Sequence, residues 1–235
     1  MVFSRDGRMF NAGSDPVFDK PDSAFRTAMD WLLDGLYVSK IINIKSLETN
    51  ESENWRVFTG GDSAVTFLPS YRSDQIFDKS VSKVAENVAM AMIPGPTHET
   101  VTWSRGLGVS TFTDAADKVW DLIDFLGGDG KDGSFYARRG WMSDIGLDSG
   151  YSHLWNDPDV REGMKNVGEE NINIIKEQTK LSRPYLQPVP WMAAWIVDLE
   201  REINRALVKE TTVDDVINKL VSGWEKRRSS SPNTK

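Results

Sequence analysis

Aromatic side chains are the groups in this sequence that are best suited to chemistry, and two of them open a predicted helix. Trp191 and Trp195 follow Pro188-Val189-Pro190 and stand four positions apart, so both project from one face of that helix. An indole offers a large apolar area and loses little conformational entropy when it is ordered. The pair could act as plates against an apolar face of a ligand, or it could pack into the core.

Arginine and tryptophan also occur together before a predicted strand, at Trp103 and Arg105. A guanidinium fork can hold two neighbouring hydroxyl groups or a carboxylate. The alternative for this pair is a packed indole and an ion pair. Three other tryptophans lie on or beside apolar helical faces and are predicted to be core residues: Trp31, Trp120 and Trp224.

The sequence lacks the residue combinations that most catalytic and metal-binding sites require. Cysteine is absent, and the two histidines, His98 and His153, have no neighbour at metal-ligand spacing. The glycine-rich stretch 127–132 lacks the Ser or Thr of a phosphate loop and carries two carboxylates, and the aspartates in and beside it do not match a calcium loop. The sequence therefore predicts no catalytic residue, no metal and no cofactor.

Charge and hydropathy exclude two further classes of partner. Thirty-five acidic and 28 basic residues give a net charge of -7, and Lys and Arg form no block before the last dozen positions, so nucleic acid is not an expected partner. The start of the chain has no apolar signal region, and no apolar stretch approaches the ~20 residues of a membrane helix.

The first half of the chain alternates helical and strand patterns. Apolar residues at helical spacing follow Asp22, which is a predicted N-cap, and a short helix is predicted to end at Gly60-Gly61. Strands are predicted at 63–68, 87–93 and 106–112. This alternation indicates an α/β organisation.

The second half is predicted to be mostly helical. A helix behind Thr113 or Asp114 ends at Gly127-Gly128, and a capping box from Thr212 to Asp215 opens the last helix. Residues 227–235 are predicted to form a disordered tail. The other predicted helices lie at 133–139, 158–167, 169–180, 191–208 and 213–224.

The order of these features resembles that of family 1 extracellular solute-binding proteins, the sugar class that includes maltose-binding-protein-like receptors. The matching motifs are Phe58-Thr59-Gly60-Gly61-Asp62-Ser63-Ala64-Val65, Leu68-Pro69-Ser70-Tyr71, Ala91-Met92-Ile93-Pro94-Gly95-Pro96, Gly106-Leu107-Gly108-Val109-Ser110, Arg183-Pro184, Pro190-Trp191-Met192-Ala193-Ala194-Trp195 and Thr211-Thr212-Val213-Asp214-Asp215-Val216. They run through nearly the whole chain.

The resemblance implies a periplasmic-binding-protein-like type II α/β fold with a helix-rich carboxyl terminus. Residues 1–102 and 158–226 would form most of the carboxyl-terminal lobe, and residues 103–157 would cross into the amino-terminal lobe. Family members are about twice as long. The amino-terminal half, with its signal peptide or lipidation site, is therefore expected to lie outside this sequence.

The function that the resemblance implies is capture of a carbohydrate by closure of two lobes, and its delivery to ABC permease subunits, without enzymatic chemistry. Such a receptor works in the periplasm or outside the cell and is held at the membrane by its transporter or a lipid anchor. Tyr71 takes the place of the family's stacking tryptophan, and Trp141 that of a proline after Gly140. The predicted ligand-binding residues are Tyr71, Trp103, Arg105, Trp141, Trp191 and Trp195.

Two other functions remain open at this point. A carbohydrate-active α/β enzyme would need two carboxylates in one cleft, about 5 to 10 Å apart. A protein-interaction module would use exposed tryptophans to bind its partner. If the chain is half of a receptor, either the missing amino-terminal half or self-association is expected to cover its open face.

Overall fold

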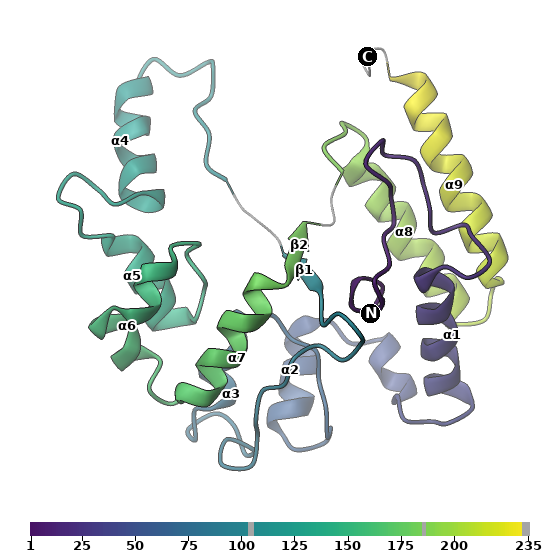
Figure 1. Ribbon diagram of the computed structural model, residues 1–235, viewed down its shortest axis with the longest axis horizontal. Helices are drawn as coiled ribbons and strands as arrows, with labels where there is room; N and C mark the ends of the chain where they lie inside the picture. The colour runs from purple at the N-terminus through teal and green to yellow at the C-terminus, as the bar shows by residue number, and fades with distance from the viewer. Residues whose placement is uncertain (103–105, 185–186, 232–235) are drawn as a thin grey trace. The chain divides into compact units, whose positions relative to one another are not determined.

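The computed structural model describes residues 1–102, 106–184 and 187–231, and it divides into two compact units (Figure 1). Unit 1 comprises Met1–Thr49, Met92–Trp103 and Gln178–Lys235, and unit 2 comprises Asn50–Ala91 and Ser104–Glu177. Each unit buries its own cluster of apolar side chains. No helix in the described part of the chain is long and apolar enough to cross a membrane.

Unit 1 is built on three long helices and a very small sheet. Helices α8 and α9 pack against each other, and the two strands of the sheet are parallel, with Val101 opposite Arg183. The elements are η1 (Phe3–Arg5), α1 (Ala24–Tyr37), η2 (Ile44–Leu47), β1 (Thr100–Thr102), β2 (Ser182–Pro184), α8 (Met192–Leu207) and α9 (Val213–Ser230).

Local capping explains where the helices of unit 1 begin. The Thr212 side chain accepts the Asp215 N–H, and the Asp215 carboxylate accepts the Thr212 N–H, so the predicted capping box is confirmed. Helix α1 is also confirmed, although its N-cap is Ser23, whose hydroxyl accepts the Arg26 N–H.

The last helix is longer than predicted. α9 continues to Ser230, so the prediction of a disordered tail from residue 227 is wrong for its first four residues. The Arg228 guanidinium bonds the Asp15 carboxylate at 2.8 Å and the Gly13 carbonyl at 3.0 Å, and Arg227 bonds Asp198. These bonds hold the end of the helix on the body of unit 1.

The described residues of unit 2 form eight short or medium helices. Its core centres on Met142, Val160 and Val167, each with at most 1% of its surface exposed. The elements are α2 (Glu51–Thr59), η3 (Ser70–Arg72), α3 (Ser73–Ile76), α4 (Ala116–Gly127), α5 (Tyr136–Ile145), η4 (Ser152–Asn156), α6 (Pro158–Gly163) and α7 (Glu169–Lys180), whose last turn belongs to unit 1. Most of the predicted helices are thereby confirmed; α5 starts later than predicted, and α6 ends earlier.

The prediction of strands at 63–68, 87–93 and 106–112 is wrong, because the described residues form strands only at β1 and β2. Two backbone groups of the 87–93 segment bond side chains where a sheet would supply a neighbouring strand. The Met90 N–H bonds the Asn171 side chain, and the Ile93 N–H bonds the Gln178 side chain. Apolar residues that a sheet would cover stay exposed, such as Val65 at 72% and Phe67 at 50%.

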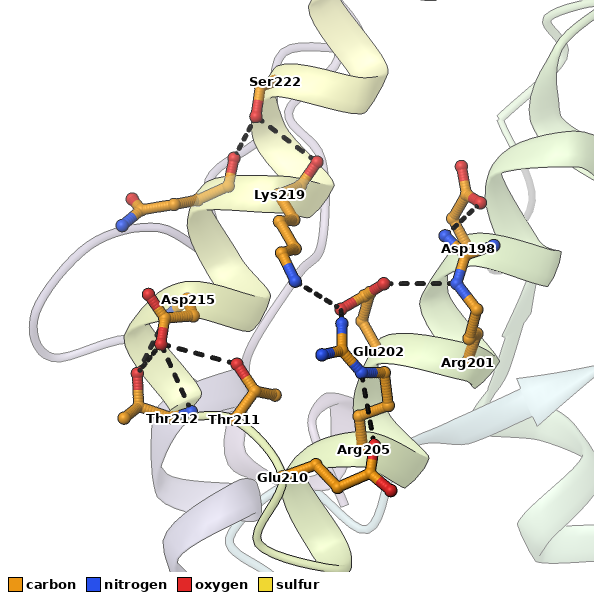
Figure 2. Close-up of polar contacts among 11 residues, drawn as sticks. Asp198, Arg201, Glu202, Arg205, Glu210, Thr211, Thr212, Asp215, Lys219 and Ser222 are labelled. Carbon is orange, nitrogen blue, oxygen red and sulfur yellow. Dashed lines mark hydrogen bonds and ion pairs between the residues drawn. The ribbon is translucent and has the colours of Figure 1, made fainter.

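A buried carboxylate joins α8 to α9 within unit 1 (Figure 2). Glu202 is only 5% exposed and accepts from Arg201 at 3.1 Å, Arg205 at 3.0 Å and Lys219 at 3.3 Å. Burial acts to raise the pKa of the Glu202 carboxyl, but the hydrogen bonds from Arg201 and Lys219 and the nearby positive charges outweigh it, so the pKa lies below its ordinary value.

Replacing this carboxylate should weaken unit 1. Glu202→Gln keeps the shape but removes the charge-assisted bonds, so we expect the free energy of unfolding to fall by about 1 to 3 kcal/mol at pH 7. Because the folded pKa is depressed, the wild-type advantage is present above the ordinary pKa of ~4.3 and is lost as the pH falls through the folded pKa. Urea unfolding of both proteins between pH 7 and pH 3 measures this. A difference in unfolding free energy between the two proteins that stays constant from pH 7 to pH 3 would contradict the stabilising role of the Glu202 charge.

Candidate functional site

A pocket at the start of α2 contains one of the predicted ligand-binding residues, Tyr71. The cavity has a volume of about 610 Å³ and belongs entirely to unit 2. Tyr71 and Arg72 in its wall are half-buried and the other lining residues are exposed, so the pocket is open to solvent. The lining residues are Asn50, Glu51, Ser52, Glu53, Arg56, Tyr71 and Arg72.

The residues around Asn50 line this pocket and determine where α2 begins. The Asn50 side chain accepts the Glu53 N–H at 3.0 Å, and the Glu53 carboxylate accepts the Asn50 N–H at 2.8 Å. This reciprocal capping box begins α2 and engages the Glu53 side chain at the N-terminal end of the helix. Gly60 then ends α2, as predicted.

Tyr71 is held by the carboxylate of Glu51. The Tyr71 hydroxyl donates to Glu51 Oε1 at 2.7 Å, and Arg72 Nε donates to the same oxygen at 3.2 Å. The hydrogen bond from Tyr71, together with the hydrogen bond and charge of Arg72, keeps the pKa of the Glu51 carboxyl below its usual value, although desolvation opposes them. Glu51 is therefore an anchored anion at the ordinary pH of a cell.

Arg72 is fixed between two aromatic rings. Its guanidinium carbon lies 5.5 Å from the centroid of the Tyr71 ring and 5.8 Å from that of Trp55, and its Nη1 donates to the Gln75 side chain at 3.2 Å. The sequence analysis did not single out Trp55. Its place one helical turn after Glu51, on the helix that precedes Tyr71, is the signal that could have found it.

One cation in the pocket wall has its donors available. The guanidinium of Arg56 is exposed, and it makes no hydrogen bond or ion pair with another residue of the described ranges. A guanidinium presents five N–H donors in a planar fork. The pocket thus combines a fixed aromatic ring, an anchored acceptor at Glu51 and a free donor fork at Arg56.

The C-terminal end of α5 packs against the segment that carries Tyr71. Gly146 closes α5 with a left-handed backbone at φ 64°, which favours glycine. A Cβ atom at this buried position would come within 3.5 Å of the Tyr71 Cα and the Ser73 Oγ. α5 and the Tyr71 segment are therefore in close contact.

Trp141 lies on the same helix but does not line this pocket. Its indole is half-buried, and the Arg138 guanidinium carbon stands 5.1 Å from its ring centroid. Two other predicted ligand-binding residues, Trp103 and Arg105, lie outside the described residues. Of the four predicted residues that the structure describes, Tyr71 alone lines this pocket.

Trp191 and Trp195 are buried in the core of unit 1, which corrects the expectation that they bind ligand and favours the alternative of core packing. Trp195 is 1% exposed, and its indole N–H donates to the Leu220 carbonyl at 3.0 Å. Its ring centroid lies 5.1 Å from that of Phe10 and 5.5 Å from that of Trp224. Trp191 is 8% exposed and packs edge-on against Trp224.

The three tryptophans predicted to be core residues differ in the structure. Trp224 is fully buried, as predicted, and Trp31 is half-buried. Trp120 is 57% exposed, so its assignment to the core is wrong. The described residues also hold no group of three or more His, Cys, Asp or Glu side chains that could bind a metal ion.

Comparison with known proteins places the fold in a class. No protein-family model matches the chain, and no curated protein matches it in sequence. Solved structures do match, and they show that the chain has the α/β fold of periplasmic binding proteins, represented here by its helix-rich part with a small parallel sheet.

Two of these structures cover almost all of the chain. Maltose-bound MalE3 from T. maritima superposes with a TM-score of 0.77 over 96% of this chain and 55% of its own, at 18% sequence identity. A "putative oligosaccharide periplasmic-binding protein" from Synechococcus sp. MITs9220 superposes with a TM-score of 0.67 over 97% of this chain and 57% of its own, at 15% identity. The chain thus spans a little more than half the length of these neighbours.

The bond between Tyr71 and Glu51 has a measurable consequence. In Tyr71→Phe the ring remains but the hydroxyl donor is lost, so we expect the pKa of the Glu51 carboxyl to rise towards its ordinary value. Carboxyl chemical shifts followed by NMR through an acid titration report this pKa. In the matched control, Tyr136→Phe, the hydroxyl is lost from an exposed tyrosine outside the pocket, and the Glu51 titration should not move.

The burial of Trp195 predicts a structural role. Trp195→Ala would leave a large cavity beside Phe10 and Trp224 and would remove the indole hydrogen bond to the Leu220 carbonyl, so we expect a loss of ~3 to 5 kcal/mol in the free energy of unfolding. Thermal and urea unfolding measure it. A variant that unfolds like the wild type would show that Trp195 is not a core residue and would return it to the list of ligand plates.

Proposed function

We propose that this chain is part of a carbohydrate-binding receptor of an ABC transporter, and that Tyr71 is a stacking plate of its ligand site. The receptor would hold its sugar without covalent chemistry and would deliver it to permease subunits from the periplasm or the outer face of the membrane. The crossing of residues 103–157 into a second lobe, and ligand contacts from Trp103, Arg105 and Trp141, remain predictions of the same proposal.

The observation that carries the proposal is the fixed Tyr71 ring in a pocket with both donors and acceptors. A sugar presents an apolar C–H face and a rim of hydroxyl groups that each donate and accept hydrogen bonds. The Tyr71 ring fits the apolar face, Arg56 can donate to the rim, and Glu51 can accept from it. Glu51 and Arg72 hold the ring in place before a ligand arrives, which lowers the entropic cost of binding.

The neighbours support a binding role. One of the structures described above is a putative oligosaccharide periplasmic-binding protein by its printed description, and the other, MalE3, holds maltose. Since this chain spans 55% of that neighbour, much of the opposing wall of a cleft would come from elsewhere. We therefore expect the chain alone to bind sugar weakly, because a single wall leaves one face of the ligand in water.

The enzyme alternative is less well supported by the same pocket. A glycoside hydrolase needs one carboxyl that stays protonated near neutral pH, and therefore a raised pKa. The two carboxylates in the pocket are Glu51 and Glu53. Tyr71 and Arg72 lower the pKa of Glu51, and Glu53 is engaged in the capping box of α2. Neither is arranged as a general acid.

Titration calorimetry with a panel of mono-, di- and oligosaccharides tests the proposal. We expect saturable but weak binding of at least one sugar, with a Kd of about 1 mM or higher. Tyr71→Ala should weaken this binding by ~1 to 2 kcal/mol, or roughly 5- to 30-fold, because it removes the plate.

Tyr136→Ala is the matched control for that measurement, since Tyr136 is 68% exposed and does not line the pocket. Equal binding by Tyr71→Ala and the wild type would remove Tyr71 from the site while leaving the receptor function standing. The absence of saturable binding by any sugar at concentrations of tens of millimolar would count against the receptor function itself.

A further inference from the structure

The pocket at the start of α2 is lined by two arginines that differ in their surroundings. The guanidinium of Arg72 uses its donors inside the protein: it bonds the Glu51 carboxylate at 3.2 Å, the Gln75 side chain at 3.2 Å and the Ser52 hydroxyl at 3.5 Å. The guanidinium of Arg56 is exposed and bonds no other residue of the described ranges. Arg56 is therefore the cation of this pocket that a ligand can engage.

The capping box explains why Arg56 has no partner on its own helix. Side chains three positions apart on a helix are neighbours, so Glu53 is the residue that would ordinarily pair with Arg56. The Glu53 carboxylate instead accepts the Asn50 N–H at 2.8 Å. It stays at the N-terminal end of α2, where the helix dipole favours a negative charge. The way in which the helix begins thus leaves the Arg56 guanidinium available.

The charges that line the pocket are compensated except at Arg56. Glu51 and Arg72 form an ion pair with each other at 3.2 Å. Glu53 lies at the helix N-terminus, which compensates part of its charge. Arg56 is the remaining charged residue among those that line the pocket, and its charge is positive.

A ligand that covers this pocket removes the Arg56 guanidinium from water. A charge that loses water without gaining an opposite charge opposes binding. Carboxylates compensate a guanidinium best, because two parallel N–H···O bonds form and each is roughly twice as strong as a bond between neutral groups. The pocket therefore favours a ligand that brings a carboxylate to Arg56 over one that brings only hydroxyl groups.

A hexuronic acid unit carries all the groups that this pocket can bind. Its ring has an apolar C–H face for the Tyr71 ring, and its hydroxyl groups can donate to the Glu51 carboxylate. Its carboxyl group, which is ionised at neutral pH, matches the planar donor fork of Arg56. A neutral hexose offers the first two of these features and lacks the third.

We propose that this pocket selects acidic saccharides, and that Arg56 is the specificity-determining residue that binds the carboxylate of a hexuronic acid unit. The inference rests on the proposed function, because it names the ligand class of the same site. The net charge of -7 repels an anionic ligand at long range. Charges more than about 8 Å apart are largely screened at physiological ionic strength, so the nearby guanidinium dominates inside the pocket.

Paired glycosides that differ only in the carboxylate test this proposal. The pairs are methyl β-D-glucuronide with methyl β-D-glucoside, and methyl α-D-galacturonide with methyl α-D-galactoside. Amide chemical shifts followed by NMR during titration measure weak dissociation constants. In at least one pair we expect the uronide to bind about three- to tenfold more tightly than its neutral partner at low salt, since an ion pair in an open pocket is partly screened. The preference should fall below about twofold in ~0.5 M NaCl.

Arg56→Gln removes the positive charge and keeps the helix propensity, so the variant should fold as the wild type does. Within this variant we expect the uronide and its neutral partner to bind equally. The matched control is Arg5→Gln, which makes the same change of charge at an exposed arginine of η1 in unit 1, outside the pocket. The control should keep the full preference for the uronide. Thermal unfolding of both variants checks that they are folded.

Three results would overturn the proposal. The first is equal binding of uronide and neutral partner by the wild type in both pairs; Tyr71-dependent binding of the neutral glycosides would then leave the receptor function standing. The second is a preference for the uronide that persists in Arg56→Gln, and the third is one that Arg5→Gln abolishes as well. If neither uronides nor neutral sugars bind saturably, the proposed function fails, and this inference fails with it.

Discussion

Unpaired extended backbone is the constraint on which the rest of this structure depends. A strand is stable only when its N–H and C=O groups find partners, and the described residues supply one ladder of three residues from each of two strands. Helices must therefore carry both cores. Side chains such as Asn171 and Gln178 bond backbone groups that a neighbouring strand would otherwise bond.

The helices could be predicted from the sequence because their signals are local. The Thr212 to Asp215 box and the glycine after α2 act within a few residues, so periodicity and capping chemistry locate these ends. The same local reasoning wrongly predicted strands at 63–68, 87–93 and 106–112. Their composition suits a sheet, but whether a partner strand is present is a property of the tertiary structure.

The candidate site was only partly predictable. Tyr71 followed from its place in a motif, whereas Glu51, which bonds it, and Arg56, which lines the same pocket, come from a helix that was predicted only by its glycine end. Trp195 was wrongly predicted to bind ligand, because a helix face that lines a cleft and one that packs into a core show the same periodicity. The stripe continues from Trp195 through Leu199 and Glu202 to Ala206, and that continuation to the far end of α8 is more typical of packing against α9 than of a rim.

The tryptophans range from fully buried to exposed, and this difference in environment has an optical consequence. Trp191, Trp195 and Trp224 are buried together in unit 1, where an indole emits at shorter wavelength and is shielded from acrylamide or iodide. Trp120 of unit 2 is open to water, and Trp55 touches Arg72 at the wall of the pocket. Trp155 is also buried, in the core of unit 2, so short-wavelength emission reports on both cores, whereas emission at the long-wavelength edge reports on exposed indoles such as Trp120.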